Sequence, residues 1–170
     1  MVDKGRPAIL LDIDGVLNPL FRELTGHDPP YCGCAAHRAW RKRRPLGAGD
    51  PLRVYVNPSH GPKLRKLAED AGAQLMWASR WQEHHAHLFG HEIGLPLMEV
   101  IPIADDQEKG AAVREYTYPA PVVWFDDEPD QFAGMQLMSH AHKLIAVDPA
   151  TGLTDDHIAQ ARDWLGVSAD

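Results

Sequence analysis

Two aspartates separated by one residue follow an apolar run near the start of the chain. The run Ala8–Leu11 leads into Asp12, Ile13, Asp14 and Gly15. Four apolar residues in a row predict a buried strand, and a glycine permits a sharp turn after it. Residues i and i+2 of a strand point to the same face, so the two carboxylates would crowd each other. Because adjacent anions are costly without a cation or proton between them, the pair indicates a metal site that contains a nucleophile.

Polar residues also end two later apolar runs of the same kind. One run ends at Ser79, and the other ends at Asp126 and Asp127. Lys109 lies at the start of a helix predicted between them. The carboxyl ends of parallel strands lie at one edge of a sheet, where open α/β sheets place their sites. Two acidic clusters, a hydroxyl and a lysine at this edge would suit a hard cation and a phosphate group.

These residues require a scaffold of alternating strands and helices. Strands are predicted over residues 8–13, 52–57, 74–78, 121–125 and 143–147. Helices are predicted from Ser59, as a cap, to a stop at Gly72, over 82–89, 107–116 and 130–140, and from Thr154, as a cap, through Leu165. Residues 93–103 hold two prolines and are predicted to be a loop with short extended pieces. The alternation implies parallel βαβ units, and therefore an α/β fold with a Rossmann-like parallel sheet flanked by helices.

The composition is that of a soluble globular protein. The chain has 170 residues, of which 44% are hydrophobic and 24% charged, and its formal net charge is −7. This acidic balance argues against binding nucleic acid over the whole surface, although a local basic patch remains compatible with it. No apolar run approaches the roughly 20 residues of a membrane helix, and no signal-peptide pattern begins the chain. We therefore expect no membrane partner and a cytoplasmic location.

Residues 1–170 are expected to form one domain, within which 18–52 is a flap or small insertion. This segment is rich in proline, glycine and charge. It also contains side chains of zinc-binding type, namely His27, Cys32, Cys34 and His37. Their spacing matches none of the standard finger patterns, so ordinary loop residues are the favoured interpretation and zinc is the alternative.

The stretch 38–44 holds five basic residues around a tryptophan. A solvated charged loop is one interpretation. The other is a clamp for a polyanionic substrate, such as a nucleotide or a nucleic-acid end. On that second interpretation Arg41 and Arg43 are candidate substrate-binding residues, together with Asn18 and Arg80 near the predicted strand ends.

A group of histidines follows Ser79 and Arg80. Helical spacing would place His84, His87 and His91 on one stripe. A second metal site is one interpretation, and a partly exposed helix surface or a substrate-facing edge is the favoured one. Trp81, just before this group, has two interpretations: contact with the substrate, and packing, which is the favoured one.

Four motifs in this order resemble those of the haloacid dehalogenase (HAD) superfamily, in its phosphatase branch. The first is the DxDGxL pattern of Asp12–Leu17, which is highly specific. The others are the apolar strand 75–79 that ends in serine, the single lysine Lys109, and the apolar strand 122–127 that ends in two aspartates. The resemblance covers about residues 8–148.

The resemblance implies an enzyme that transfers phosphoryl groups. Asp12 would attack phosphorus and form an aspartyl-phosphate. Asp14 would protonate the leaving oxygen and then take a proton from the hydrolytic water. Ser79 would donate a hydrogen bond to a phosphoryl oxygen, and Lys109 would stabilise charge on the nucleophile and the phosphate.

The same resemblance implies Mg²⁺ as the cofactor. The carboxylate of Asp12, the backbone carbonyl of Asp14 and the carboxylate of Asp126 would hold it, with Asp127 as the alternative direct or water-mediated ligand. The expected function is that of a Mg²⁺-dependent phosphomonoesterase whose open site suits a large substrate, or a small one enclosed by a partner subunit. The alternatives are a phosphotransferase or phosphomutase with the same nucleophile, and a non-catalytic nucleic-acid-binding module.

Overall fold

A five-stranded parallel sheet forms the centre of the computed structural model, which describes residues 5–20, 41–43, 54–130 and 141–168. The strand order is β5-β4-β1-β6-β7. The strands are β1 (Ala8–Leu11), β4 (Gln74–Trp77), β5 (Glu99–Val100), β6 (Val122–Asp126) and β7 (His142–Ala146). The α/β fold with a Rossmann-like parallel sheet is confirmed.

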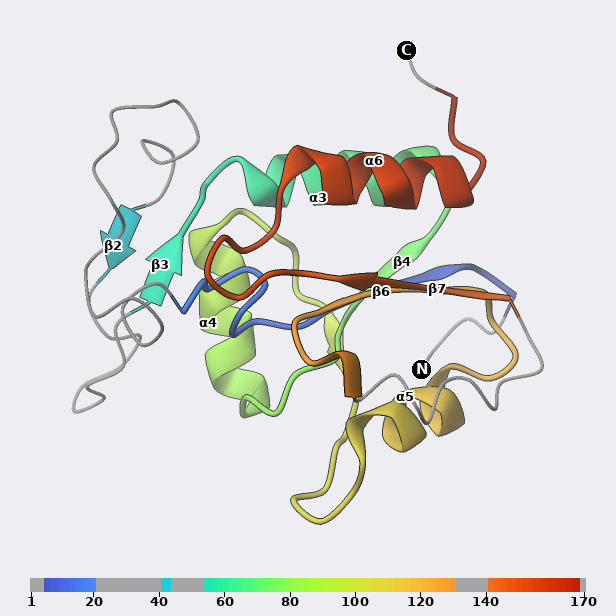
Figure 1. Ribbon diagram of the computed structural model, residues 1–170, viewed down its shortest axis with the longest axis horizontal. Helices are drawn as coiled ribbons and strands as arrows, with labels where there is room; N and C mark the ends of the chain where they lie inside the picture. The colour runs from blue at the N-terminus through green and yellow to red at the C-terminus, as the bar shows by residue number, and fades with distance from the viewer. Residues whose placement is uncertain (1–4, 21–40, 44–53, 131–140, 169–170) are drawn as a thin grey trace.

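Helices cover both faces of this sheet (Figure 1). They are α3 (His60–Asp70), α4 (Glu83–Glu92), α5 (Lys109–Thr117) and α6 (Asp155–Trp164). Ile9 and Leu11 pack in the core that also contains residues of α3, α4 and α6, whereas Ala8 and Leu10 pack in the core that contains residues of α5. Because both faces are covered, β1 is buried along its whole length and reads as an uninterrupted apolar run.

The strand predicted over 52–57 does not join the central sheet. It is β3 (Val54–Val56), and it pairs antiparallel with β2 (Arg41–Arg43), which lies in the segment 18–52 that the sequence predicts to be a flap or small insertion. This hairpin lies beyond the end of the sheet at which the loop after β1 also lies (Figure 1). The two edges of the central sheet are formed by β5 and β7, and β5 agrees with the short extended pieces predicted for 93–103.

Of the two helix caps predicted from the sequence, one is confirmed and one is wrong. Thr154 caps α6 as predicted, because its hydroxyl accepts the backbone N–H of His157. Ser59 precedes α3, but its side chain makes no capping bond. The hydroxyl of Ser59 instead donates to Oδ1 of Asn57, so the predicted cap is wrong in its mechanism. In the described part of the chain, no helix combines the length and apolar character that crossing a membrane requires.

Several predictions fall outside the described residues. They concern most of the helix predicted over 130–140 and the four candidate zinc ligands His27, Cys32, Cys34 and His37. For Arg41 and Arg43 only the backbone is described, as part of β2.

Candidate active site

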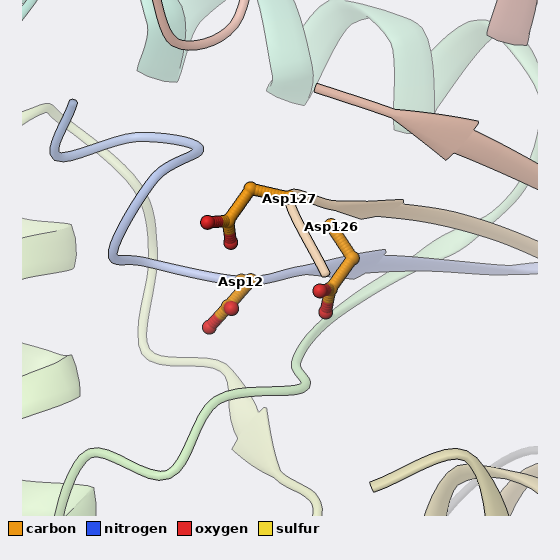
Figure 2. A group of neighbouring side chains, drawn as sticks. All are labelled: Asp12, Asp126 and Asp127. Atoms are coloured by element: carbon orange, nitrogen blue, oxygen red, sulfur yellow. The ribbon is translucent and has the colours of Figure 1, made fainter. Parts of the chain in front are cut away.

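The carboxyl ends of two neighbouring strands, β1 and β6, bring the predicted acidic residues together. Asp12 directly follows β1, Asp126 is the last residue of β6, and Asp127 comes next. One carboxylate oxygen from each of these three residues lies within 4.8 Å of the others (Figure 2). The arrangement follows from the register, because Leu11 pairs with Phe125 of β6 in parallel strands that end together.

Lys109, the first residue of α5, reaches into this acidic group from the face of the sheet that α5 covers. Its Nζ lies 2.5 Å from Oδ2 of Asp12 and 2.5 Å from Oδ2 of Asp126. The lysine is only 2% exposed, and its ammonium lies 5.7 Å from the ring centre of Trp124. Burial acts to lower the pKa of Lys109, but the charges of Asp12 and Asp126 outweigh it and raise that pKa overall. The side chain therefore remains an ammonium at neutral pH.

The acidic group carries more negative charge than one lysine can balance. Burial, followed by the charge of Asp12, raises the pKa of Asp126 to about 7 and the pKa of Asp127 to about 6. Oδ2 of Asp126 is buried and pairs with Lys109 without a hydrogen bond of good geometry. Carboxylate oxygens are the ligands that hard divalent cations prefer, so these three residues fit a site for such a cation.

The glycine of the first motif makes the approach of Asp127 possible. Gly15 has φ +72°, and a Cβ atom at this position would lie 2.2 Å from Cγ of Asp127. The turn around it is held by the carbonyl of Ile13, which accepts the backbone N–H groups of Leu17 and Asn18 at 2.9 and 2.7 Å. A side chain at residue 15 would therefore strain the backbone and displace one of the acids of the site.

Asp14 is held apart from the acidic group by two other side chains. Nδ2 of Asn18 donates to its Oδ1 at 2.7 Å, and Nε1 of Trp81 donates to its Oδ2 at 2.6 Å. Among the described residues, the group of carboxylates that could hold a metal does not include Asp14. The predicted metal contact through the backbone carbonyl of Asp14 stays a prediction.

The predicted partners of the phosphate and the substrate lie nearby. Ser79 follows β4 at the same edge of the sheet and is buried, and its Oγ accepts the backbone N–H of Trp81 at 3.4 Å. Arg80 is exposed, but its guanidinium donates to the carbonyls of Ala104 and Gln107 at 3.2 and 3.0 Å. Arg80 thus holds the loop that leads to Lys109, and its role in binding substrate stays a prediction.

Asn18 is buried, and both ends of its amide are used within the protein. Its Oδ1 accepts the backbone N–H of Tyr55 in β3 at 2.8 Å, while its Nδ2 donates to Asp14. This geometry gives Asn18 a role in joining the β2–β3 hairpin to the loop after β1. The substrate-binding role predicted for it is not tested by these contacts.

The histidines of α4 form no metal-binding group in the described residues. A ring nitrogen of His87 lies 2.9 Å from the carbonyl oxygen of Met98, and the rings of His84 and His85 have centroids 5.6 Å apart. Trp81 packs against the core as the favoured interpretation predicted, but its hydrogen bond to Asp14 was not predicted. No local pattern marks its contact with Asp14, which is 67 residues away in the chain.

A comparison with protein families decides the assignment. The model described as "HAD domain in Swiss Army Knife RNA repair proteins" matches residues 8–158. The chain belongs to this family. The match covers all four motifs and confirms the resemblance to the HAD superfamily. A search of curated proteins found no match.

Three solved structures share the fold, and two of them are of a HAD domain. The HAD domain of the effector protein Lem4 from Legionella pneumophila, as an inactive mutant, has a TM-score of 0.59 and 12% identity over 96% of this chain and 94% of that one. The same domain in another structure has a TM-score of 0.56 at 13% identity, over 96% and 95% of the two chains. A hypothetical protein from Xanthomonas campestris has a TM-score of 0.51 at 13% identity, over 96% and 84%. At such low identity these likenesses show the fold alone.

Proposed function

We propose that this HAD domain is a Mg²⁺-dependent phosphomonoesterase that acts through an aspartyl-phosphate on Asp12. The observation that carries the proposal is the setting of the Asp12 carboxylate. Its Oδ1 accepts the backbone N–H of Ile13 at 2.7 Å, and its Oδ2 pairs with Lys109. A carboxylate held at both oxygens presents a fixed nucleophile at the sheet edge where Asp126 and Asp127 also lie.

Each catalytic residue then has a defined part in the reaction. Asp12 forms a bond to phosphorus while the bond from phosphorus to the leaving oxygen breaks, and Asp14 gives a proton to that oxygen. Asp14 then takes a proton from the water that attacks the aspartyl-phosphate, which frees Asp12 and releases inorganic phosphate. Lys109 balances charge on the nucleophile and the phosphoryl oxygens, and Ser79 donates a hydrogen bond to one of those oxygens.

Asp12, Asp126 and Asp127 are the carboxylates that would hold Mg²⁺, together with the backbone carbonyl of Asp14. When bound, the ion would supply positive charge that offsets the phosphoryl oxygens and the crowded carboxylates. Which of Asp126 and Asp127 contacts the ion directly stays open in this proposal.

The proposed substrate is a phosphate monoester on a nucleotide or on the end of a nucleic acid. The family description, which refers to RNA repair proteins, supports this class. The β2–β3 hairpin supports it too, because it contains Arg41 and Arg43 and is joined to the site through the contact between Tyr55 and Asn18. Arginines on a flap next to a phosphate site suit a polyanionic substrate.

The test is phosphate release in the presence and absence of Mg²⁺. The substrates are p-nitrophenyl phosphate, nucleotides, sugar phosphates and oligonucleotides with a terminal phosphate. Wild type is compared with Asp12→Asn and with the control Asp105→Asn, which alters an exposed loop aspartate outside the acidic group. We expect Mg²⁺-dependent release by wild type and the control, and none above background by Asp12→Asn.

Three results would contradict the proposal. A folded wild type that releases no phosphate from any substrate but binds nucleic acid in a salt-dependent manner would indicate a binding module. Transfer of the phosphoryl group to an added sugar or nucleoside in place of water would indicate a phosphotransferase. Undiminished phosphate release by Asp12→Asn would show that Asp12 is not the nucleophile.

A further inference from the structure

Two side chains from separate parts of the chain donate hydrogen bonds to the two oxygens of the Asp14 carboxylate. Nε1 of Trp81 donates to Oδ2 at 2.6 Å, and Nδ2 of Asn18 donates to Oδ1 at 2.7 Å. The carboxylate cannot turn about its terminal bond without losing both hydrogen bonds. We propose that Asn18 and Trp81 are positioning residues that hold the Asp14 acid/base toward the leaving oxygen. This inference rests on the proposed function above.

The core of the protein sets the orientation of Trp81. The indole packs edge-on against Phe89 of α4, with ring centroids 5.8 Å apart and planes at 73°. Phe89 is fully buried and packs edge-on against Trp77 of β4, with centroids 6.4 Å apart. The indole of Trp81 therefore belongs to a row of packed aromatic rings, and this packing limits the directions in which its N–H can point.

The side chain of Asn18 is also fixed in one orientation. It is 6% exposed, and its Oδ1 accepts the backbone N–H of Tyr55 at 2.8 Å. Because a backbone N–H can only donate, the amide oxygen faces β3 and the amide nitrogen must face Asp14. The two positioning residues therefore tie Asp14 to the β2–β3 hairpin and to the helix α4.

The effect of misplacing Asp14 depends on the leaving group of the substrate. An acid in the correct orientation accelerates departure of a basic leaving group, such as phenolate, which needs a proton. p-Nitrophenolate is a much weaker base and departs without one. The ratio kcat/KM covers the steps up to cleavage of the phosphorus–oxygen bond, so hydrolysis of the aspartyl-phosphate does not enter it. A misplaced Asp14 should therefore lower kcat/KM for phenyl phosphate far more than for p-nitrophenyl phosphate.

The experiment measures kcat/KM with both substrates and Mg²⁺ for wild type, Trp81→Phe and Asn18→Asp. Asn18→Asp keeps the shape and the acceptor for Tyr55 but replaces the donor to Asp14 by a carboxylate oxygen, which repels the Asp14 carboxylate. The matched control is Trp77→Phe, since Trp77 packs on the same phenylalanine and its Nε1 makes no hydrogen bond among the described residues. Thermal unfolding and circular dichroism check that each variant is folded.

We expect Trp81→Phe and Asn18→Asp to lower kcat/KM about 10-fold or more for phenyl phosphate and less than about 3-fold for p-nitrophenyl phosphate. Trp77→Phe should change both values by the same factor. Equal losses on the two substrates, or no loss in folded variants, would overturn the inference while the proposed function stands. If Trp81→Phe does not fold, Asn18→Asp decides by the same criterion. A wild type inactive on both substrates would instead count against the proposed function, and the inference would fall with it.

Discussion

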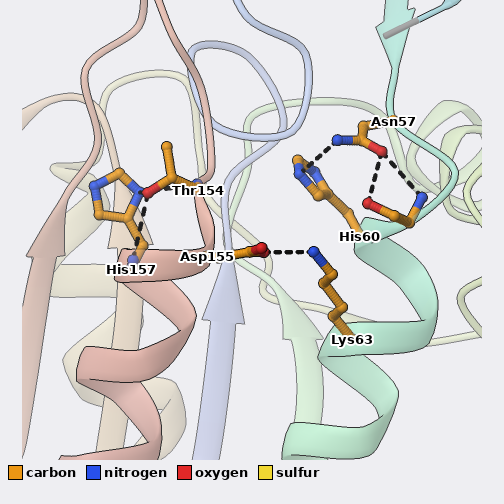
Figure 3. A network of polar contacts seen from close by, with 7 residues as sticks. Asn57, His60, Lys63, Thr154, Asp155 and His157 are labelled. Atoms are coloured by element: carbon orange, nitrogen blue, oxygen red, sulfur yellow. Dashed lines mark hydrogen bonds and ion pairs between the residues drawn. The ribbon is translucent and has the colours of Figure 1, made fainter. Parts of the chain in front are cut away.

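Two lysine–aspartate pairs in this protein have the same length and opposite surroundings. Lys109 with Asp12 and Lys63 with Asp155 both place Nζ 2.5 Å from a carboxylate oxygen. The side chains of the first pair are 2% and 9% exposed, whereas those of the second pair, shown in Figure 3, are 41% and 77% exposed. Water screens the second pair, so it contributes little to stability. In the first pair the loss of one partner would leave a buried charge, so burial rather than distance decides what the pair does.

The two regions also differ in their balance of charge. In the layer of α3 and α6, Asp70 is paired with both Lys66 and Arg162, and Lys63 with Asp155. At the carboxyl edge of the sheet, three carboxylates lie close together, and one ammonium pairs with two of them. The helical layer is thus locally compensated, and the sheet edge keeps an excess of negative charge that suits a metal ion and its phosphate.

The largest expected effect is that of Lys109→Met. It should abolish phosphate release and lower the free energy of unfolding by about 3–5 kcal/mol, because Asp12 and Asp126 would lose their buried partner. Mg²⁺ should restore part of this loss, since it would bind the same carboxylates. Urea unfolding with and without Mg²⁺ measures both quantities.

Lys63→Met is the matched control for this variant. The exposed pair should change the free energy of unfolding by less than about 1 kcal/mol, and Mg²⁺ should make no difference to that change. Similar losses of unfolding free energy in the two variants would show that burial does not decide how much each lysine–aspartate pair contributes to stability.

The next effect concerns His60, which lies at the start of α3 and near Lys63 (Figure 3). Burial, with Lys63 as the second cause, lowers the pKa of His60 from 6.5 to about 4. The unfolded chain takes up a proton near pH 6.5, and the folded chain does so only near pH 4. The stabilisation is therefore complete above pH 6.5 and decreases by up to about 3 kcal/mol as the pH falls to 4.

His60→Gln should make the free energy of unfolding less dependent on pH in that range. Urea unfolding of wild type and variant at pH 7 and pH 4.5 gives the two differences. An equal decrease of the unfolding free energy in both proteins would show that buried His60 does not make the fold sensitive to acid.

The smallest expected difference separates two glycines with similar backbones. Gly15 has φ +72° and Gly72, after α3, has φ +59°, but only Gly15 has atoms near a Cβ position. Gly72→Ala should cost about 1 kcal/mol of backbone strain. Gly15→Ala should cost about 1–3 kcal/mol more, because the methyl group would collide with Asp127. Thermal unfolding checks this, and equal costs would mean that Asp127 moves away freely.

The sheet edge could be predicted because its residues occupy periodic positions. Asp12 and Asp126 end apolar runs, and parallel strands bring such ends together whatever the loops do. Lys109 begins a helix that leads back to the same sheet, so its place was also accessible from order along the chain. The family motifs add the roles of these residues to their positions.

The contacts around Asp14 could not be predicted in the same way. Trp81 and Asn18 have ordinary local patterns, and their roles depend on how α4 and the β2–β3 hairpin pack against the loop after β1. The placement of β3 failed for a related reason. Its partner Arg41–Arg43 is a short charged stretch without a strand pattern, so nothing in the sequence indicated a separate antiparallel pair.

The most direct test of the central claim is to look for the phosphoryl group on Asp12. Wild type is mixed with Mg²⁺ and its best substrate, quenched in acid before steady state, digested and examined by mass spectrometry. We expect one phosphorylated peptide, the one that contains Asp12, at early times and none in Asp12→Asn. Phosphate release without any phosphorylated peptide, or a phosphoryl group on a different residue, would contradict the central claim.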